Sequence, residues 1–401
     1  MQKSLAVEKP DLTVLSPLSE EPAHGPALHA RTLTPAEMTP QIIRAWANLE
    51  TRALQVNPFL SPYFVLPSIR HLNPHADIRI VLVEDRLSDE VFGVGILELK
   101  HPSLHLPVFR LDAYRSIHCY LDGLLVDPRH SSSVINAFLN YFSKSTSPWH
   151  AVRFSFCPTE HPCGNLMNGT TPSGLRWHQT GTVQRAILTP KTSGEAYLKS
   201  RLNHRYRECR RLLRQLSKHG TVSWHYIAGD DVSTETIESF LDLEHRGWKR
   251  DVGTSLASQL TDYLFFRDMI EHFQRERRVF FTELRLNGRA IASTCNLRSG
   301  HAGFAFKIGW DTRYARWAPG ILNEVQFILA APDCCRDLDY IDSCAGPGTF
   351  IETLWLDRRT LISGVYSTTA LGRTVMRTQQ LVRTFLKSSG IRRLWCAPSI
   401  P

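Results

Sequence analysis

Two arginines and a Pro-Gly pair mark the stretch with the clearest potential for chemistry. Arg313 and Arg316 lie in the loop DTRYARWAPG (311–320), and Pro319-Gly320 opens a run with apolar residues at helical spacing. Proline suits the first helical turn, and glycine lets another group approach the backbone closely. Free N–H groups at a helix N-terminus, together with positive side chains, bind pyrophosphate and other anions. The same spacing also fits an ordinary strand-to-helix connection with two surface arginines.

The elements around this loop are expected to be an antiparallel meander, a helix and a further strand. Asn287-Gly288 and Ser299-Gly300 separate runs rich in β-branched and aromatic residues. Two-residue connections that end in glycine are typical of β-hairpins. The expected strands cover residues 278–286, 289–298, 301–310 and 337–342.

The loop and two further segments resemble a known family. GWDTRYARWAPGILNEV (309–325), FLDLEHRGWKR (240–250) and NPFLSPYF (57–64) are similar to motifs of the CelD-like (BioF2-like) cellulose-biosynthesis proteins. These are GNAT-fold acyltransferases related to the FemAB aminoacyltransferases. The resemblance runs from Leu33 onward, and it implies an α/β protein with tandem GNAT-like domains and mixed central sheets. It also implies that the N-terminal domain has lost cofactor binding.

The resemblance implies an acyl-CoA, or another acyl-carrier thioester, as the acyl donor. In GNAT folds the pyrophosphate lies at this helix N-terminus, and the pantetheine arm pairs with the splayed edge of the preceding strand. The acyl group would pass to an amine or hydroxyl by direct attack, with backbone N–H groups stabilising the oxyanion. The residues that the resemblance assigns to cofactor binding are Phe306, Lys307, Gly309, Arg313, Tyr314, Arg316, Trp317, Gly320 and Asn323.

Asp342 and His245 are the candidates for acid–base catalysis. An attacking amine must lose a proton, and a carboxylate or imidazole can accept it. Asp342 ends an expected strand and His245 lies in an expected helix, where a lone histidine is also commonly structural. The family usually has a lysine in the segment after Asp342, and this sequence has Ile351 there. The missing lysine favours an alternative, a catalytically degenerate partner of a polysaccharide-synthesis complex.

The segment from Ser193 to His219 is the most basic part of the chain. Its leucines recur at helical spacing, so we expect a basic helix that connects two domains and ends at Gly220. A solvated connecting helix explains this composition, and so does a platform for an anionic acceptor, a membrane face or, in a FemAB-like aminoacyltransferase, aminoacyl-tRNA. No RNA-binding signature or zinc-finger spacing accompanies it, so sequence-specific nucleic-acid recognition is not expected.

Length and composition indicate a globular protein of two domains. The chain has 401 residues, 42% of them hydrophobic, and a formal charge of +9 that suits anionic ligands. Nine irregularly spaced cysteines and the lack of a signal pattern predict reduced thiols and a cytoplasmic location. Cys157 to Cys163 lacks a second ligand pair, so no metal is expected. The predicted divisions are a disordered tail (1–30), an N-terminal domain (31–185), the basic helix (186–220) and a C-terminal acyltransferase domain (221–395).

Overall fold

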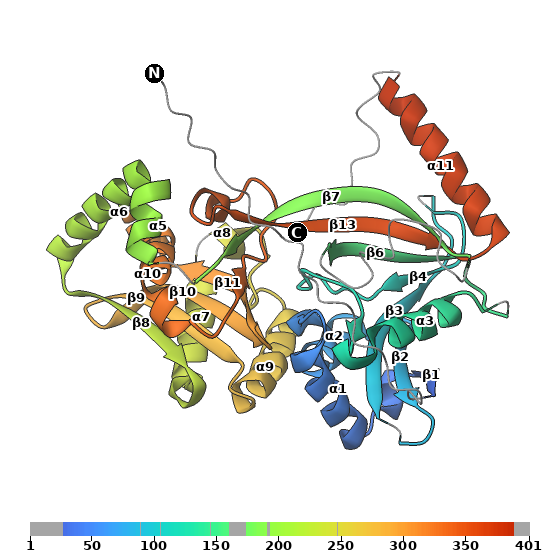
Figure 1. Cartoon of the computed structure of the whole chain (residues 1–401). Helices are drawn as coiled ribbons and strands as arrows, with labels where there is room; N and C mark the ends of the chain where they lie inside the picture. The colour runs from blue at the N-terminus through green and yellow to red at the C-terminus, as the bar shows by residue number, and fades with distance from the viewer. Residues whose placement is uncertain are drawn as a thin grey trace, which may run out of the picture.

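The computed structural model describes residues 27–88, 90–104, 106–144, 146–159, 174–190, 193–246 and 248–388. Most of the predicted tail (1–30) lies outside these ranges. So do His161 and Cys163 of the cysteine segment, and residues 389–395 of the predicted C-terminal domain. The described residues form a mixed α/β fold around one long sheet (Figure 1).

Thirteen strands make up this sheet. They are β1 (Leu28–Leu33), β2 (Ile78–Asp85), β3 (Val91–Lys100), β4 (Arg110–Ala113), β5 (Leu125–Val126), β6 (Ala151–Pro158), β7 (Arg176–Leu188), β8 (Val222–Ala228), β9 (Val279–Leu286), β10 (Arg289–Ser299), β11 (Ala302–Trp310), β12 (Tyr340–Asp342) and β13 (Asp357–Ser367). The order across the sheet is β1-β2-β3-β4-β6-β13-β7-β12-β11-β10-β9-β8, and β5 pairs with β3.

The two halves of the sheet repeat one pattern. Strands β1 to β4 form an antiparallel meander, and so do β8 to β11. In each half the last strand of the meander then pairs in parallel with a strand that comes later in the sequence. β4 pairs with β6, and β11 pairs with β12. Each half also receives its last strand from the other half. β7, which follows β6 in the sequence, pairs with β12, and β13, which follows β12, pairs with β6. The repeat agrees with the tandem α/β arrangement expected from the sequence, but a boundary after residue 185 falls inside β7.

Helices cover both faces of the sheet. They are α1 (Pro40–Arg52), α2 (Pro62–Leu72), α3 (Ser131–Phe142), α5 (Gly194–Arg201), α6 (Asn203–Leu216), α7 (Thr234–His245), α8 (Trp248–Asp251), α9 (Leu260–Arg275), α10 (Pro319–Cys334) and α11 (Ala370–Ser388). In the C-terminal half, α5, α6 and α10 share one apolar core, while α7 and α9 lie in a second core on the other face. This second core includes Phe59 and Phe64 of the N-terminal half, and α2 packs against α9. The two halves therefore share buried surface beside β11.

Two predicted helices differ from those observed. The capping box of Thr34 and Glu37 is present, but it closes only a 3-10 turn, and α1 begins at Pro40 with the Thr39 side chain as its cap. Thr39 and Pro40 are a second pair of capping residue and first-turn proline. The long helix begins at this pair because the continuous apolar face begins there. The basic segment forms two helices, since Leu202 leaves the helical region with φ −133°.

The predicted hairpin at Asn287-Gly288 is confirmed, and both residues have positive φ, 51° and 79°.

Candidate active site

Strands β11 and β12 separate soon after they meet. They pair in parallel over three residues only, from Ala302 opposite Tyr340 to Phe304 opposite Asp342. β11 continues to Trp310, and no strand in the described part of the chain pairs with that edge of it beyond Phe304. An edge of this kind leaves backbone N–H and C=O groups for a ligand. In the N-terminal half β4 ends at Ala113, one residue beyond its pairing with β6, so the equivalent edge is missing there.

A β-bulge shapes β11 where the strands separate. Cys295 pairs with Lys307 and Asn296 with Ala305, so Phe306 is the extra residue. Phe306 is 2% exposed and packs among aromatic rings from both halves of the chain. The ammonium of Lys307 lies 5.6 Å from the centre of the Tyr120 ring. Phe306 therefore supports the strand from within the core, whereas Lys307 lies beside a residue of the N-terminal half.

The N-terminus of α10 opens next to the end of β11. Ala318 adopts a left-handed conformation (φ 50°), and the first helical hydrogen bond runs from Leu322 N to Ala318 O. The N–H groups of Gly320 and Ile321 have no partner within the helix, so they lie at its positive end. A Cβ on Gly320 would meet only side chains, Trp310 at 3.4 Å and Ile308 at 3.5 Å. Gly320 thus packs α10 against β11.

The two loop arginines have different surroundings. Arg313 is held by Asp311, with Nε 3.0 Å from Oδ1 and Nη2 2.5 Å from Oδ2. The hydrogen bond from Arg313 is the main reason why the pKa of Asp311 is lowered, although partial burial opposes it. Arg316 lies over the ring of Trp317 at 3.8 Å, and within the described residues no carboxylate pairs with it. Arg316 is therefore the more available of the two for an anion.

Tyr314 and Trp317 fix the loop that carries these arginines. Trp317 is 7% exposed, and its ring lies 4.7 Å from that of His219 and 6.0 Å from that of Tyr314. His219 follows α6, so these contacts tie the loop to the basic helices. Both aromatic residues hold the loop from the protein side.

Asn323 is buried inside the protein, between α10 and the meander. It is 0% exposed, and its Nδ2 donates to Thr282 Oγ1 at 3.0 Å and to Thr294 Oγ1 at 3.2 Å. Its Oδ1 accepts from Trp224 Nε1 at 3.0 Å. These bonds join α10 to three strands of the meander. The structure thus gives Asn323, predicted as a cofactor contact, a supporting role.

Asp342 is also fully buried, and arginines engage both of its oxygens. Arg359 Nη1 lies 3.2 Å from Oδ2 and Arg185 Nη1 lies 3.6 Å from Oδ1. The Cys344 N–H donates to Oδ1 at 2.8 Å. Arg185 is in β7 and Arg359 in β13, so Asp342 joins these two strands to β12. With both oxygens engaged in this way, Asp342 positions β12 against β7 and β13, and its predicted role in acid–base catalysis stays a prediction.

Lys249 lies beside the unpaired edge of β11, although sequence reasoning gave it no role. Its Nζ donates to Ile308 O at 2.7 Å and to Glu244 Oε1 at 2.9 Å. Glu244 is 1% exposed, and its Oε2 accepts from Leu256 N at 2.8 Å. Burial lowers the pKa of Lys249, and Lys307 adds to that effect while Glu244 opposes it. Both residues fall in the segment FLDLEHRGWKR, which was the one signal that could have found them.

Gly309 allows α7 to lie directly on β11. A Cβ there would come within 2.6 Å of the backbone nitrogen of Glu244. His245 follows at the end of α7, half-buried, with Nδ1 2.7 Å from Ser255 Oγ. The end of α7 thus brings a carboxylate and, through α8, an ammonium to the unpaired part of β11, and His245 is the residue next to that carboxylate.

The N-terminal half contributes a second polar pair to this region. His118 Nε2 lies 3.2 Å from Asp262 Oδ1 of α9, and burial lowers the pKa of His118. Burial also acts against the charge of Lys307, but Tyr120, Glu244 and Asp262 outweigh it, so the pKa of Lys307 is raised. His118 and Tyr120 lie far from the motif in sequence, and no local pattern points to them.

Within the described ranges, no three His, Cys, Asp or Glu side chains gather closely enough to hold a metal ion. None of the helices in that part of the chain is both long and apolar enough to cross a membrane.

Comparison with known proteins identifies the class of this fold. Residues 203–350 match the family model described as Acetyltransferase (GNAT) domain. No match to a curated protein sequence was found. The matched stretch spans α6 to β12, and it includes the separated strands, the basic loop and α10. The chain is therefore a mixed α/β enzyme with an acyltransferase domain of GNAT type.

Solved structures share the fold over most of the chain. FemX superposes with a TM-score of 0.52 at 9% identity, covering 87% of this chain and 100% of that chain. The C-terminal domain of a putative lysylphosphatidylglycerol synthetase from Agrobacterium fabrum has a TM-score of 0.50 at 10% identity, covering 87% and 96%. A conserved protein of unknown function from Bacteroides thetaiotaomicron has a TM-score of 0.50 at 12% identity, covering 84% and 98%. At these identities the likeness is one of fold.

Proposed function

We propose that this enzyme transfers an acyl group from acyl-CoA, bound where β11 and β12 separate, to an amine or hydroxyl. The observation that carries the proposal is the unpaired edge of β11 beside the N-terminus of α10. A thioester arm needs backbone hydrogen bonds along an extended segment, and a pyrophosphate needs N–H groups and positive charge. The separated strands and the basic loop offer both within one strand–loop–helix unit.

In this proposal each part of the cofactor has its own partners. The pantetheine arm lies along residues 305–310 of β11, including Gly309. The pyrophosphate lies at the N–H groups of Gly320 and Ile321, with Arg316 beside it. Arg313 contributes positive charge while it holds the loop through Asp311. Tyr314 and Trp317 support the loop through its apolar side.

Lys249 takes the charge-stabilising role that the family lysine would otherwise supply. Ile351, at the position where a lysine is usual, is 6% exposed and lies in an apolar core. Lys307 is part of β11 and Lys249 is bound to it at Ile308, so both charges lie where negative charge develops on the thioester oxygen. His245 is the proposed base that accepts the proton from the attacking group. Asp342 positions β12 in this scheme, because both of its oxygens are engaged by arginines.

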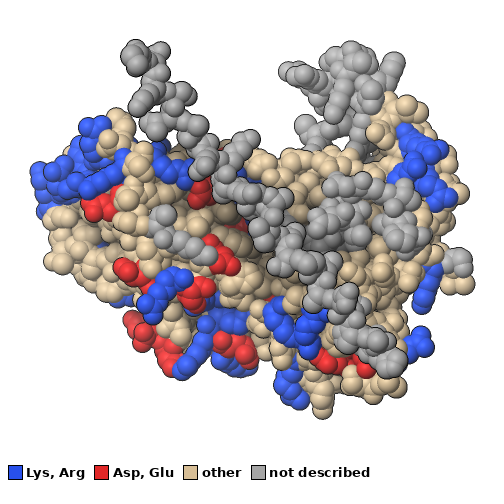
Figure 2. All heavy atoms as spheres, viewed as in Figure 1, with Lys and Arg blue, Asp and Glu red and all other residues tan. Residues whose placement is uncertain are grey.

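The acceptor is proposed to be a lipid, a small molecule or a polysaccharide precursor. The resemblance to CelD-like proteins favours a polysaccharide precursor. An anionic acceptor, or the surface of an anionic membrane, would meet the basic face of α6 (Figure 2). We define this α6 basic face by the exposed residues Arg207, Arg210, Arg211, Arg214 and Lys218.

Aminoacyl transfer from aminoacyl-tRNA is the second candidate. FemX and the putative lysylphosphatidylglycerol synthetase share the fold, and the α6 basic face supplies charge for a nucleic acid without base-specific groups. Binding through such a face is electrostatic, so it should weaken strongly as salt rises.

Calorimetric titration of the full chain with coenzyme A and, separately, with bulk tRNA tests the two donors. We expect coenzyme A to bind with a 1:1 stoichiometry. We expect the affinity for tRNA to fall by a factor on the order of 10³–10⁵ between 50 and 200 mM salt, as it does for proteins that contact several phosphates. Tight tRNA binding that persists at high salt, without binding of coenzyme A, would reverse the ranking. Binding of neither would leave the catalytically degenerate partner as the better account.

A further inference from the structure

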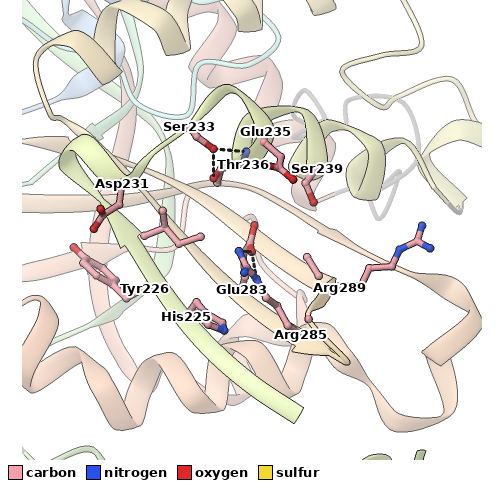
Figure 3. A pocket seen from close by; sticks show the side chains of 13 residues that line it. His225, Tyr226, Asp231, Ser233, Glu235, Thr236, Ser239, Glu283, Arg285 and Arg289 are labelled. Atoms are coloured by element: carbon pink, nitrogen blue, oxygen red, sulfur yellow. Dashed lines mark hydrogen bonds and ion pairs between the residues drawn. The ribbon is translucent and has the colours of Figure 1, made fainter. Parts of the chain in front are cut away.

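A cavity of ≈ 570 Å³ lies between the first turns of α7 and strands β8 to β10 (Figure 3). Its polar lining includes His225, Asp231, Glu235, Ser239, Glu283 and Arg285. None of the residues assigned above to acyl transfer is among its lining residues. A volume of this order suits a small organic molecule, so the cavity can hold a ligand of its own.

Glu283 has a buried carboxylate oxygen without a partner. The residue is 1% exposed, and Arg285 engages only Oε2, with Nε at 2.8 Å and Nη2 at 2.7 Å. Oε1 is buried and has no hydrogen-bond partner among the described residues. In Figure 3 the carboxylate of Glu283 points from β9 toward the first turns of α7. A buried carboxylate oxygen costs free energy unless a donor meets it, so a ligand that donates there gains affinity.

A second buried oxygen without a partner in the described part of the chain belongs to Ser293 on the neighbouring strand, but Ser293 is not among the residues that line the cavity. Glu283 is paired with Ser293 of β10 and with His225 of β8. Directly paired residues on neighbouring strands have their side chains on one face, about 5 Å apart. Ser293 is 0% exposed, and its Oγ is buried without a partner in the described ranges. The unpaired oxygen that a ligand in the cavity can meet is therefore Oε1 of Glu283.

The charges around the cavity select the sign of that group. Asp231 and Glu235 line the cavity with Glu283, while the guanidinium of Arg285 is already engaged by Glu283. In Figure 3 the guanidinium of Arg289 extends away from the other labelled side chains. An ammonium offers three N–H donors and no acceptor, which matches the unpaired Glu283 oxygen and the carboxylates of Asp231 and Glu235.

We propose that this cavity is a binding site for a small primary amine, held as its ammonium ion by Glu283 with the carboxylates of Asp231 and Glu235 beside it. The inference goes beyond the proposed acyl transfer and does not depend on it. The amine site uses the N-terminal turns of α7, whereas Glu244, at the other end of α7, lies against Gly309 of β11.

The test is a ligand-observed NMR titration of full-length protein with ethanolamine as the probe. The buffer is free of amines and near pH 7.5. Ethylene glycol is the matched neutral probe, since it replaces the ammonium with a hydroxyl. We expect saturable binding of ethanolamine and at least tenfold weaker binding of ethylene glycol.

Two variants act on the site in different ways. Glu283→Gln removes the charge, while Ser239→Trp fills the cavity from α7 and leaves Glu283 in place. Each should weaken ethanolamine binding at least tenfold. Glu238→Gln is the matched control, because Glu238 is exposed on the same helix and pairs with Arg267 outside the cavity; it should bind as wild type does.

Absence of ethanolamine binding to the wild type, equal binding of the two probes, or wild-type binding by either cavity variant would overturn the proposal. Coenzyme A affinity is measured on the same samples and should stay unchanged, so the amine site and the acyl site are judged separately.

Discussion

Lys249 Nζ lies 2.7 Å from the main-chain carbonyl of Ile308, so a side chain of α8 is bound to the strand whose edge is unpaired. The same ammonium is 2.9 Å from Glu244 Oε1, and Glu244 is almost completely buried. This arrangement fixes a positive charge beside β11 and anchors the end of α7. It also makes the charge of Glu244 depend on Lys249 for its compensation.

Lys249→Met should therefore destabilise the fold. Removal of one partner of a buried ion pair typically costs about 3–5 kcal/mol, because an uncompensated charge stays inside. The double variant Lys249→Met with Glu244→Gln should recover most of this loss, since the glutamine oxygen can still accept from Leu256. Urea unfolding at pH 7 measures the free energies.

The control for this pair is Lys199→Met, which breaks an exposed i,i+4 pair with Glu195 and should cost under about 0.5 kcal/mol. If Lys249→Met and Lys199→Met were equally stable, the Lys249–Glu244 pair would not be a buried contact in solution.

The two glycines predicted as cofactor contacts should respond in opposite ways to alanine. At Gly309 a Cβ would lie 2.6 Å from the Glu244 nitrogen, so α7 must move; overpacking of this kind typically costs about 1–3 kcal/mol. At Gly320 the nearest atoms are side chains at 3.4 Å or more, so alanine should be tolerated within about 0.5 kcal/mol. Thermal unfolding of both variants checks this, and similar melting temperatures would contradict it.

The meander and the helix after it were predictable because their signals are local. Asn287-Gly288 specifies a tight turn by its positive φ values, and Pro319 marks a helix start by its missing N–H. The order of the central strands could not be read in the same way. β7 and β13 pair along their whole length across the middle of the sheet, and such pairing depends on contacts that are distant in sequence.

The candidate site was predictable where it coincides with the loop, or with the segments around Gly309 and His245 that resemble the family. Arg316 and Gly320 follow from residue type and spacing. Asn323 and Asp342 share the loop's neighbourhood in sequence, but their burial depends on partners such as Trp224 and Arg185 that no local pattern supplies. Lys249 could not be predicted because its contact with Ile308 joins α8 to β11, which are distant in the sequence.

The contribution of Glu324 to stability should fall as pH rises from about 4.5 to 7. Burial raises the pKa of Glu324 to about 7 from its ordinary value of 4.5. The folded state then binds more protons than the unfolded state between these values, so the free energy of unfolding decreases with pH by up to roughly 1.4 kcal/mol per unit. Above pH 7 this contribution is constant.

Glu324→Gln isolates this effect. The amide oxygen can still accept from Thr294, whose Oγ1 lies 2.8 Å from Glu324 Oε1, but it does not ionise. Asp122, whose pKa burial also raises to about 7, is present in both proteins and cancels in the difference. Urea unfolding at pH 5 and pH 7.5 should show the variant gaining stability relative to the wild type as pH rises. A constant difference would mean that Glu324 stays ionised, or stays neutral, throughout.

In the loop between β11 and α10, Arg316 should be the side chain that contributes most to binding of the pyrophosphate. Arg316→Ala should weaken coenzyme A binding by about 1.5–3 kcal/mol, the range for a charge-assisted hydrogen bond. Arg313→Ala should lose less affinity and lower the melting temperature more, because the Arg313 guanidinium is engaged by Asp311. Arg336→Ala is the matched control, since Arg336 is exposed just beyond the opposite end of α10. Calorimetry measures the affinities, and an Arg316→Ala affinity equal to that of Arg336→Ala would show that the loop only connects β11 to α10.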